Sequence, residues 1–290
     1  MTAPHGSSSP IGVLPFQLRL PPAALVPAMP HLLASDPAPS WAELAAATRT
    51  VGDRLRAAGV DSVLLLSTQW FTVLGHQVQC DARLRGRRTD ENWYRYDFGH
   101  LDHDLAVDTE LAHRWADAID AAGMQARRTL YEGFPVDTGT IVASRLLDPR
   151  GEGRWATVSC NLYADPSAMA AVAAAGVRAA QALGRRLGVV AVSGLSSGLT
   201  GRWIAPAEDR VPDVHDRWNR KVLDAIRAGD RAEVLAMSPQ FGEAAQADSQ
   251  FRAFAFLDGA GAVDRPGEVL AYGPIWGTGA AVVWWGSDSD

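Results

Sequence analysis

The stretch VLLLSTQWF, from Val63 to Phe71, indicates the class of fold to which the chain belongs. Its apolar run predicts a buried strand over Asp61 to Leu66, after which Ser67, Thr68 and Gln69 make the chain polar. In α/β folds, ligands and catalytic groups gather beyond the carboxyl ends of buried strands. Gln69 therefore stands where a metal enzyme would place a histidine.

Strands and helices alternate along most of the chain. Apolar runs predict further strands at AALVP near the start, ATVSCNLY, GVVAVSG, EVLAYGP and AAVVWW. Helical spacing and end signals predict helices over Ser40 to Gly59 with Ser40 as N-cap, Asp108 to Ala122, Pro166 to Gly188, Asp213 to Ala228 and Gly242 to Leu257. Arg83 to Asp104 has no clean periodicity and is expected to be a long loop with short pieces of regular structure, while Ile141-Val142 begins a short strand or a helix.

This alternation predicts an α/β fold, a single-domain sandwich in which helices flank a central, mainly parallel or mixed sheet. Residues 23–286 are expected to form that domain. Small residues and proline in MTAPHGSSSP predict that residues 1–22 form a disordered or loosely attached tail.

Composition limits the possible partners. The 290 residues carry a net charge of −6, which argues against binding to nucleic acid or to an anionic membrane. No apolar run approaches the roughly 20 residues that span a bilayer. The start lacks the features of a signal peptide, and two cysteines, Cys80 and Cys160, fit a reducing compartment, so we expect a cytoplasmic protein.

Two short motifs permit chemistry but have ordinary explanations. GLSSG does not have the G-x-S-x-G spacing of hydrolases, and a tight turn after a strand explains it. His100 and His103, with Asp102 or Asp104, offer a weak alternative metal site, although a solvated charged loop has the same composition.

Aromatic residues are dense in DENWYRYDF, which suggests a partner surface or the wall of a pocket for an aromatic ligand. Candidate pocket residues are His31, Trp70, Trp93 and Thr138. Asn92 to Phe98 and the helix Val214 to Ala228 are the candidate interfaces.

Several segments together resemble the class III extradiol ring-cleavage dioxygenases. The segments that carry the resemblance are LVPAMPHLL, VLLLSTQW, DENWYRYDF, FPVDTGTI, VSGLSSG, DRWNRKVLDAIRAGD and YGPIWGTGAAVVWW, spread from about Ala23 to Trp285. The chain is most similar to the 2-aminophenol 1,6-dioxygenase group, whose enzymes contain two related chains. The catalytic chain of that group binds a ferrous ion through two histidines and a carboxylate, with a further histidine as acid and base.

This resemblance implies that four functional positions have changed in the chain. The first ligand histidine corresponds to Ala28 and the second to Gln69, while only His31 survives from the P-H-x-P-H pattern. The carboxylate position corresponds to Asp248, and the acid/base histidine to Ser197. No catalytic group of the family is therefore expected to be intact, and losing two nitrogen ligands should abolish useful affinity for iron.

The resemblance also implies a partner. STQW and DENWY are similar to the α subunit of the group, which is considered non-catalytic. We therefore expect a degenerate-site subunit that binds no cofactor itself and that stabilises and shapes a homologous catalytic β-type subunit, which would hold Fe(II) and cleave a 2-aminophenol- or catechol-type ring. Two alternatives stay open. One is a stand-alone dioxygenase with relocated ligands among His31, His76, His100 and His103, and the other is a binder of small aromatic ligands.

Overall fold

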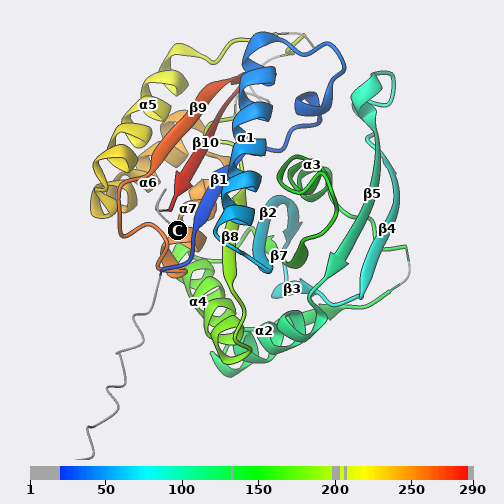
Figure 1. Cartoon of the computed structure of the whole chain (residues 1–290). Coiled ribbons are helices and arrows are strands. Elements are labelled where there is room, and N and C mark those ends of the chain that lie inside the picture. The colour runs from blue at the N-terminus through cyan, green and yellow to red at the C-terminus, as the bar shows by residue number, and fades with distance from the viewer. Residues whose placement is uncertain (1–19, 132, 198–202, 206–207, 287–290) are drawn as a thin grey trace, which may run out of the picture.

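A ten-stranded mixed sheet forms the centre of the computed structural model, which describes residues 20–131, 133–197, 203–205 and 208–286 (Figure 1). The strand order along the main path is β4-β5-β7-β2-β8-β1-β10-β9. Neighbouring strands from β5 to β1 are parallel, whereas β4, β10 and β9 each pair antiparallel with their neighbour. The predicted α/β fold with a mainly parallel or mixed sheet is confirmed.

The elements have the following bounds. The strands are β1 Ala23–Val26, β2 Ser62–Thr72, β3 His76–Gln79, β4 Arg83–Thr89, β5 His100–Val107, β6 Ala126–Thr129, β7 Arg154–Asn161, β8 Leu187–Val192, β9 Glu268–Ile275 and β10 Thr278–Trp285. The α-helices are α1 Pro39–Ala57, α2 Thr109–Ala121, α3 Thr138–Leu147, α4 Pro166–Ala182, α5 Asp213–Ala228, α6 Arg231–Ala245 and α7 Arg252–Gly259. The short 3₁₀ helices are η1 Pro30–Leu33, η2 Asp97–Gly99 and η3 Asp248–Phe251.

Helices cover the sheet from both sides (Figure 1). Helices α1 and α3 pack together on one face, and α2, α4 and α7 form the layer on the other, where α5 and α6 also pack against each other. The contact between α1 and α3 is close, because a Cβ at Gly52 would lie 2.0 Å from the carbonyl oxygen of Leu147. Leu64, Leu65 and Leu66 of β2 are fully buried between these layers, as their apolar run predicts.

Two predicted helix ends are wrong. Helix α1 begins at Pro39 with Ala38 as N-cap, and the Ser40 hydroxyl donates instead to Asp209 and to the carbonyl oxygen of Pro274. Proline at the first helical position suits this start because its missing N–H would have no partner there. Helix α4 ends at Ala182 rather than Gly188, which lies inside β8.

The segment Arg83 to Asp104 is not a long loop. Strands β4 and β5 form an antiparallel hairpin, and only Ala106 and Val107 of β5 pair with β7. Strand β4 consists mainly of arginines and has few apolar residues, because most of the hairpin faces solvent. Ion pairs such as Arg87–Asp102, 2.6 Å, join the two strands of the hairpin. The stretch at Ile141-Val142, left open between strand and helix, is the middle of α3.

The predicted helix from Gly242 to Leu257 is also wrong. Helix α6 ends at Ala245, and α7 begins only at Arg252. Between them Ser249, Gln250 and Phe251 have φ values of 46°, 55° and 56°, in the left-handed region where L residues are strained.

Most of the predicted N-terminal tail, residues 1–19, lies outside the described part of the chain. In the part that is described, every helix is too short or too polar to cross a bilayer.

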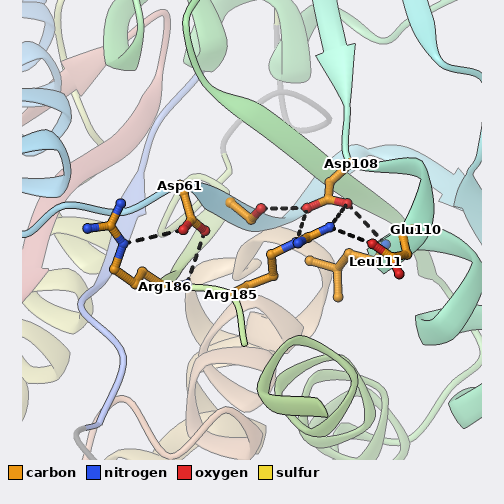
Figure 2. Close-up of polar contacts among 7 residues, drawn as sticks. Asp61, Asp108, Glu110, Leu111, Arg185 and Arg186 are labelled. Atoms are coloured by element: carbon orange, nitrogen blue, oxygen red, sulfur yellow. Dashed lines mark hydrogen bonds and ion pairs between the residues drawn. The ribbon is translucent and has the colours of Figure 1, made fainter. Parts of the chain in front are cut away.

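A polar network lies at the amino ends of β2 and β8, beside the residue that follows β5 (Figure 2). Asp108 caps α2 by accepting the N–H of Leu111, and it also accepts hydrogen bonds from Ser62, 2.6 Å, and from Arg185, 2.8 Å. Burial disfavours its charged form, but the hydrogen bonds from Arg185, Ser62 and Leu111 outweigh burial and lower the pKa of the Asp108 carboxyl. Arg185 pairs in addition with Glu110.

Substituting Arg185 with alanine should destabilise the fold by about 2 kcal/mol, because the buried Asp108 carboxylate then loses its cationic partner. The free energy of unfolding, measured by urea denaturation, checks this. The folded chain holds the pKa of Asp108 below the ordinary value of 3.8, so Asp108 is charged above that pH. The destabilisation caused by Arg185→Ala should therefore reach its full size above pH 3.8 and become smaller as the pH falls below it.

The neighbouring Arg186→Ala is the matched control, since Arg186 is 71% exposed and pairs with a half-exposed Asp61. It should change the stability by less than about 0.5 kcal/mol. Equal effects of the two substitutions would contradict the role given to Asp108.

Candidate functional site

A pocket of about 290 Å³ lies where the carboxyl ends of β1, β2 and β8 meet. Parallel neighbours bring these ends to one edge of the sheet, and the turn between β9 and β10 closes the pocket from the side. Its lining consists of Pro27, Ala28, Met29, Pro30, Thr68, Gln69, Asp90, Asn92, Trp93, Thr138, Ser193, Gly194, Ser196, Ser197, Asp248, Trp276, Thr278 and Ala280. The four positions that the resemblance aligns with the ligands and the acid/base group, Ala28, Gln69, Ser197 and Asp248, all belong to this lining.

Strand β2 departs from regular pairing at the pocket. Ser67 pairs with Ser159 and Phe71 with Cys160, so Thr68, Gln69 and Trp70 bulge out of the ladder with β7. A bulge redirects side chains that a regular strand would hold in strict alternation. The polar segment predicted to follow the strand therefore lies inside it, as an irregular part of β2.

The carboxylate of Asp248 is the polar centre of the pocket. Its Oδ2 accepts hydrogen bonds from the hydroxyl groups of Thr68, 2.8 Å, and Ser193, 3.0 Å, and from the N–H of Gly194, 2.9 Å. Its Oδ1 accepts from Ser249, 3.1 Å. The carboxylate therefore joins the ends of β2 and β8 to η3.

A buried arginine stabilises the strained segment that carries Asp248. Arg252 donates to the carbonyl oxygens of Leu162, Ala164 and Ser249 at 2.7 to 2.9 Å. These bonds attach η3 to the loop after β7. They offset the cost of three consecutive residues with positive φ, which is of order 1 to 3 kcal/mol for each residue.

The Gln69 side chain lines the pocket and is hydrogen-bonded within it. Its amide nitrogen donates to the carbonyl oxygen of Ala28, 3.3 Å, and its backbone N–H donates to the hydroxyl of Ser67. The amide thereby bridges the ends of β1 and β2, and its oxygen has no protein partner among the described residues.

The two serines of GLSSG have different surroundings. The hydroxyl of Ser196 accepts from the buried amide of Asn219, 2.8 Å, which also donates to the hydroxyl of Tyr272, 3.1 Å. Tyr272 in turn donates to Asp216, 2.7 Å, and burial followed by this hydrogen bond raises the pKa of Tyr272. Ser197 contributes its backbone N–H to the carbonyl oxygen of Gln246.

Two tryptophans form the aromatic wall of the pocket. Trp93 comes from the β4–β5 hairpin, and Trp276 from the two-residue turn between β9 and β10; their ring centroids are 4.6 Å apart with the planes at 84°. Trp276 and Gly277 have φ values of 45° and 73°, as a type I′ hairpin turn requires. Positive φ at a bulky residue is strained, and such strain concentrates at functional sites.

His31 lies behind this wall and does not line the pocket. It is completely buried, and its ring contacts those of Trp41, Trp93 and Phe98 at centroid distances of 4.4 to 4.8 Å. Neither ring nitrogen has a hydrogen-bond partner among the described residues. Burial lowers the pKa of His31 from 6.5 to about 4, and the nearby Asp90 opposes this shift. The imidazole is therefore neutral near pH 7.

Of the other predicted pocket residues, two line the pocket and one does not. Trp93 and Thr138 line the pocket, and the Thr138 hydroxyl donates to Asp90, 2.9 Å. Trp70 lies outside the lining and packs edge-on against Phe134.

His100 and His103 lie three residues apart on β5, so regular alternation directs them to opposite faces of the strand. No cluster of three or more potential metal-ligating side chains occurs in the described part of the chain.

The side chains at the family positions do not fit a ferrous ion. Ala28 has no donor atom, and the Gln69 amide is bonded to the Ala28 carbonyl. The Asp248 oxygen that faces β2 and β8 already accepts three hydrogen bonds. A site with two histidines and one carboxylate needs free nitrogen lone pairs that these positions do not supply.

Asp90 and Ser193 also shape the site, and sequence reasoning did not find them. Ser193 follows a predicted buried strand, so its position at a strand end was the available signal. Asp90 lies in a segment interpreted as a loop, where no spacing marked it.

Comparison with known proteins gives the family. No family model matches the chain. The chain is 37% identical over 268 residues to the alpha subunit of 2-aminophenol 1,6-dioxygenase of Pseudomonas sp., covering 90% of this chain and 97% of that subunit. It is 25% identical over 285 residues to the beta subunit of 2-aminophenol 1,6-dioxygenase of Pseudomonas sp.. That match covers 90% of this chain and 92% of the beta subunit. A crystal structure of an uncharacterized protein from Escherichia coli K12 has a TM-score of 0.65 at 14% identity, covers 91% of this chain and 99% of that one, and supports the fold alone.

The chain therefore belongs to the class III extradiol ring-cleavage dioxygenase family. Within that family it is more similar to the alpha subunit of 2-aminophenol 1,6-dioxygenase than to the beta subunit.

Replacing Asp248 with alanine should lower the free energy of unfolding by about 3 kcal/mol, because three hydroxyls and one N–H lose their acceptor. Asp248→Asn, which keeps one side-chain acceptor, should lose about 1 kcal/mol. Urea denaturation measures both, and an alanine variant as stable as the wild type would contradict the structural role of this carboxylate.

His31 should make stability depend on pH. The unfolded chain binds a proton at this histidine near pH 6.5 and the folded chain only near pH 4, so stability should fall as pH decreases between these values, by up to roughly 3 kcal/mol. His31→Phe removes the titrating group and keeps an aromatic ring, so its stability relative to the wild type should increase over this window. A difference that does not vary from pH 7 to pH 4.5 would contradict this expectation, and exposed His100→Ala serves as the control.

Proposed function

We propose that the chain is a non-catalytic subunit of a two-chain extradiol dioxygenase that opens a 2-aminophenol- or catechol-type ring. In this proposal a homologous β-type subunit holds Fe(II) and performs the chemistry, and the present chain binds no iron. The present chain stabilises and shapes its partner in a hetero-oligomer, with the cytoplasm as the expected compartment.

The observation that carries the proposal is the Asp248 carboxylate. In the family the corresponding position provides a metal ligand, whereas here its inward oxygen accepts three hydrogen bonds from the protein itself. The neighbouring positions contribute a methyl group at Ala28, an amide at Gln69 and a hydroxyl at Ser197. Similarity to both subunits of a two-subunit dioxygenase supports the heteromeric assembly.

The alternative of a stand-alone dioxygenase that binds iron through other histidines has less support than this proposal. His31 is enclosed by aromatic rings, and His76 is buried with a lowered pKa caused by burial. His100 is exposed, and its ring nitrogen is 3.2 Å from the hydroxyl of Thr89. A facial iron site requires three such groups around one point.

The interface with the catalytic subunit stays a prediction. Val214 at the start of α5 is 45% exposed, and Tyr94 and Tyr96 are 49% and 38% exposed. Exposed aromatic and aliphatic side chains of this kind suit a protein contact.

Co-purification with a homologous catalytic chain tests the proposal. The present chain alone should contain well under one iron per chain and should not cleave 2-aminophenol or catechol, while the complex should bind iron and turn over. Iron analysis and the absorbance of the ring-opened product provide the measurements.

Alanine substitutions of His76, His100 and His103 in this chain should leave the activity of the complex within about twofold of the wild type, because no iron ligand is removed. The corresponding substitution of a ligand histidine in the partner is the positive control and should abolish activity. Stoichiometric iron and turnover in the isolated chain would overturn the proposal.

A further inference from the structure

Strand β4 forms one end of the sheet, and within the described part of the chain its outer edge is open. The strand order begins at β4, whose partner among the described strands is β5, and Figure 1 shows these two strands at the margin of the molecule. An edge strand presents a row of backbone N–H and C=O groups with which another chain can pair.

The edge of β4 has the length and regularity that the addition of a strand requires. The strand consists of seven residues, Arg83 to Thr89, and each of them has a partner on β5 without a shift of register. Proline residues and β-bulges commonly protect edge strands, and these seven residues contain neither. Charge is therefore the main protection of this edge.

The two faces of β4 differ in chemistry. Arg83, Arg85 and Arg87 alternate along the strand, so their side chains share one face, and each is at least 62% exposed. Leu84 on the other face is buried. The face that carries the three arginines is thus the face directed to solvent.

Positive charge exceeds negative charge on this solvent face. Asp102 and Asp104 of β5 lie opposite Arg87 and Arg85 in the hairpin. Arg87 pairs with Asp102 at 2.6 Å, whereas Asp104 is shared by Arg83 and by Arg85, the latter at 3.8 Å. Three guanidinium groups face two carboxylates, and Arg85, which is 80% exposed, is the least neutralised of the three.

These charges determine which strand can pair with β4. Directly opposite side chains in an antiparallel pair lie on the same face, with Cβ atoms about 5 Å apart. A second copy of the chain, related by a two-fold axis, would set arginine opposite arginine, and like charges in that position destabilise the pair. A strand with a carboxylate at every second position would instead give each arginine a partner, so the same charges exclude one partner and admit another.

We propose that the open edge of β4 binds an extended strand of a different polypeptide chain that carries aspartate or glutamate at alternate positions. The strand adds antiparallel to β4 through backbone hydrogen bonds, and its carboxylates lie beside Arg83, Arg85 and Arg87. Its side chains next to Leu84 are apolar or small. No residue of β4 lines the pocket, so this surface is separate from it. The inference does not depend on the proposed function, because the edge belongs to this chain alone.

A charge-swapped form of the full-length chain supplies an acidic strand on the same scaffold. It carries Arg83→Glu, Arg85→Glu, Arg87→Glu, Asp102→Arg and Asp104→Arg, which keep the ion pairs of the hairpin with their signs exchanged. Neither the wild type nor the swapped chain should self-associate, because like charges oppose each other in both cases. Their mixture should form a 1:1 complex, with an affinity at least about tenfold higher than that of either chain for itself.

Analytical ultracentrifugation measures the complex, and hydrogen exchange locates it. The backbone amides of β4 in the wild type should exchange more slowly after mixing, because a new strand covers the edge. The complex should weaken at about 1 M salt, where charges are screened within roughly 3 Å.

Surface charge elsewhere provides the matched control. Asp53→Arg with Arg56→Asp exchanges an exposed ion pair of α1 and should give no complex with the wild type. Arg85→Glu alone in the wild type should weaken the complex with the swapped chain by roughly five- to tenfold, because a carboxylate then faces the acidic strand. Circular dichroism checks that each variant is folded.

A peptide probe tests the wild type without any change to the chain. The alternating acidic peptide TEVEVET, at millimolar concentration, should slow the exchange of the β4 amides, whereas the basic counterpart TKVKVKT should not, because its lysines oppose the arginines.

An equal effect of the two peptides, or no effect of the acidic one, would overturn the proposal. A mixture of folded wild-type and swapped chains that stays monomeric would do the same, and so would a wild type that self-associates as strongly as the mixture. A mixed complex whose β4 amides exchange as fast as in the free chain would also overturn it, because another surface would then form the contact.

Discussion

The carboxylate of Asp248 is the interaction on which the geometry of the pocket depends. One oxygen accepts hydrogen bonds from Thr68, Ser193 and Gly194, and thereby joins two parallel strands to a segment far along the chain. Three donors directed at one charged oxygen form a strong, directional junction. The hydrogen bonds thereby cross-link segments that lie far apart in the sequence.

The cost of this arrangement lies in the backbone that carries Asp248. Ser249, Gln250 and Phe251 have left-handed conformations, which L residues avoid. The three hydrogen bonds of Arg252 to backbone carbonyls stabilise the segment, and Trp276 on the opposite side of the pocket is also held at positive φ. Strain on both sides of one pocket is typical of a site whose shape is functional rather than incidental.

The sequence predicted the elements whose signals are local. Helices α2 and α5 and the strands β1 and β9 formed within about a residue of where the apolar spacing placed them, and β10 begins two residues before the predicted strand. Predictions were wrong where tertiary contacts overrode local signals. The β4–β5 hairpin is polar because it extends from the main sheet, and the predicted single late helix is interrupted because Arg252 and the Asp248 contacts stabilise a break.

The amino-acid sequence by itself determined the α/β class and the family resemblance, because these follow from side-chain identity and from short-range periodicity, and it predicted four changed positions. Only the tertiary structure decided that Ala28, Gln69, Ser197 and Asp248 share one pocket, and that Asp248 binds protein donors there. It also placed the ring of Trp276 against that of Trp93, although these residues are far apart in the chain. Such contacts depend on the order and register of parallel strands, which bring distant segments to one edge of the sheet and which local sequence patterns do not specify.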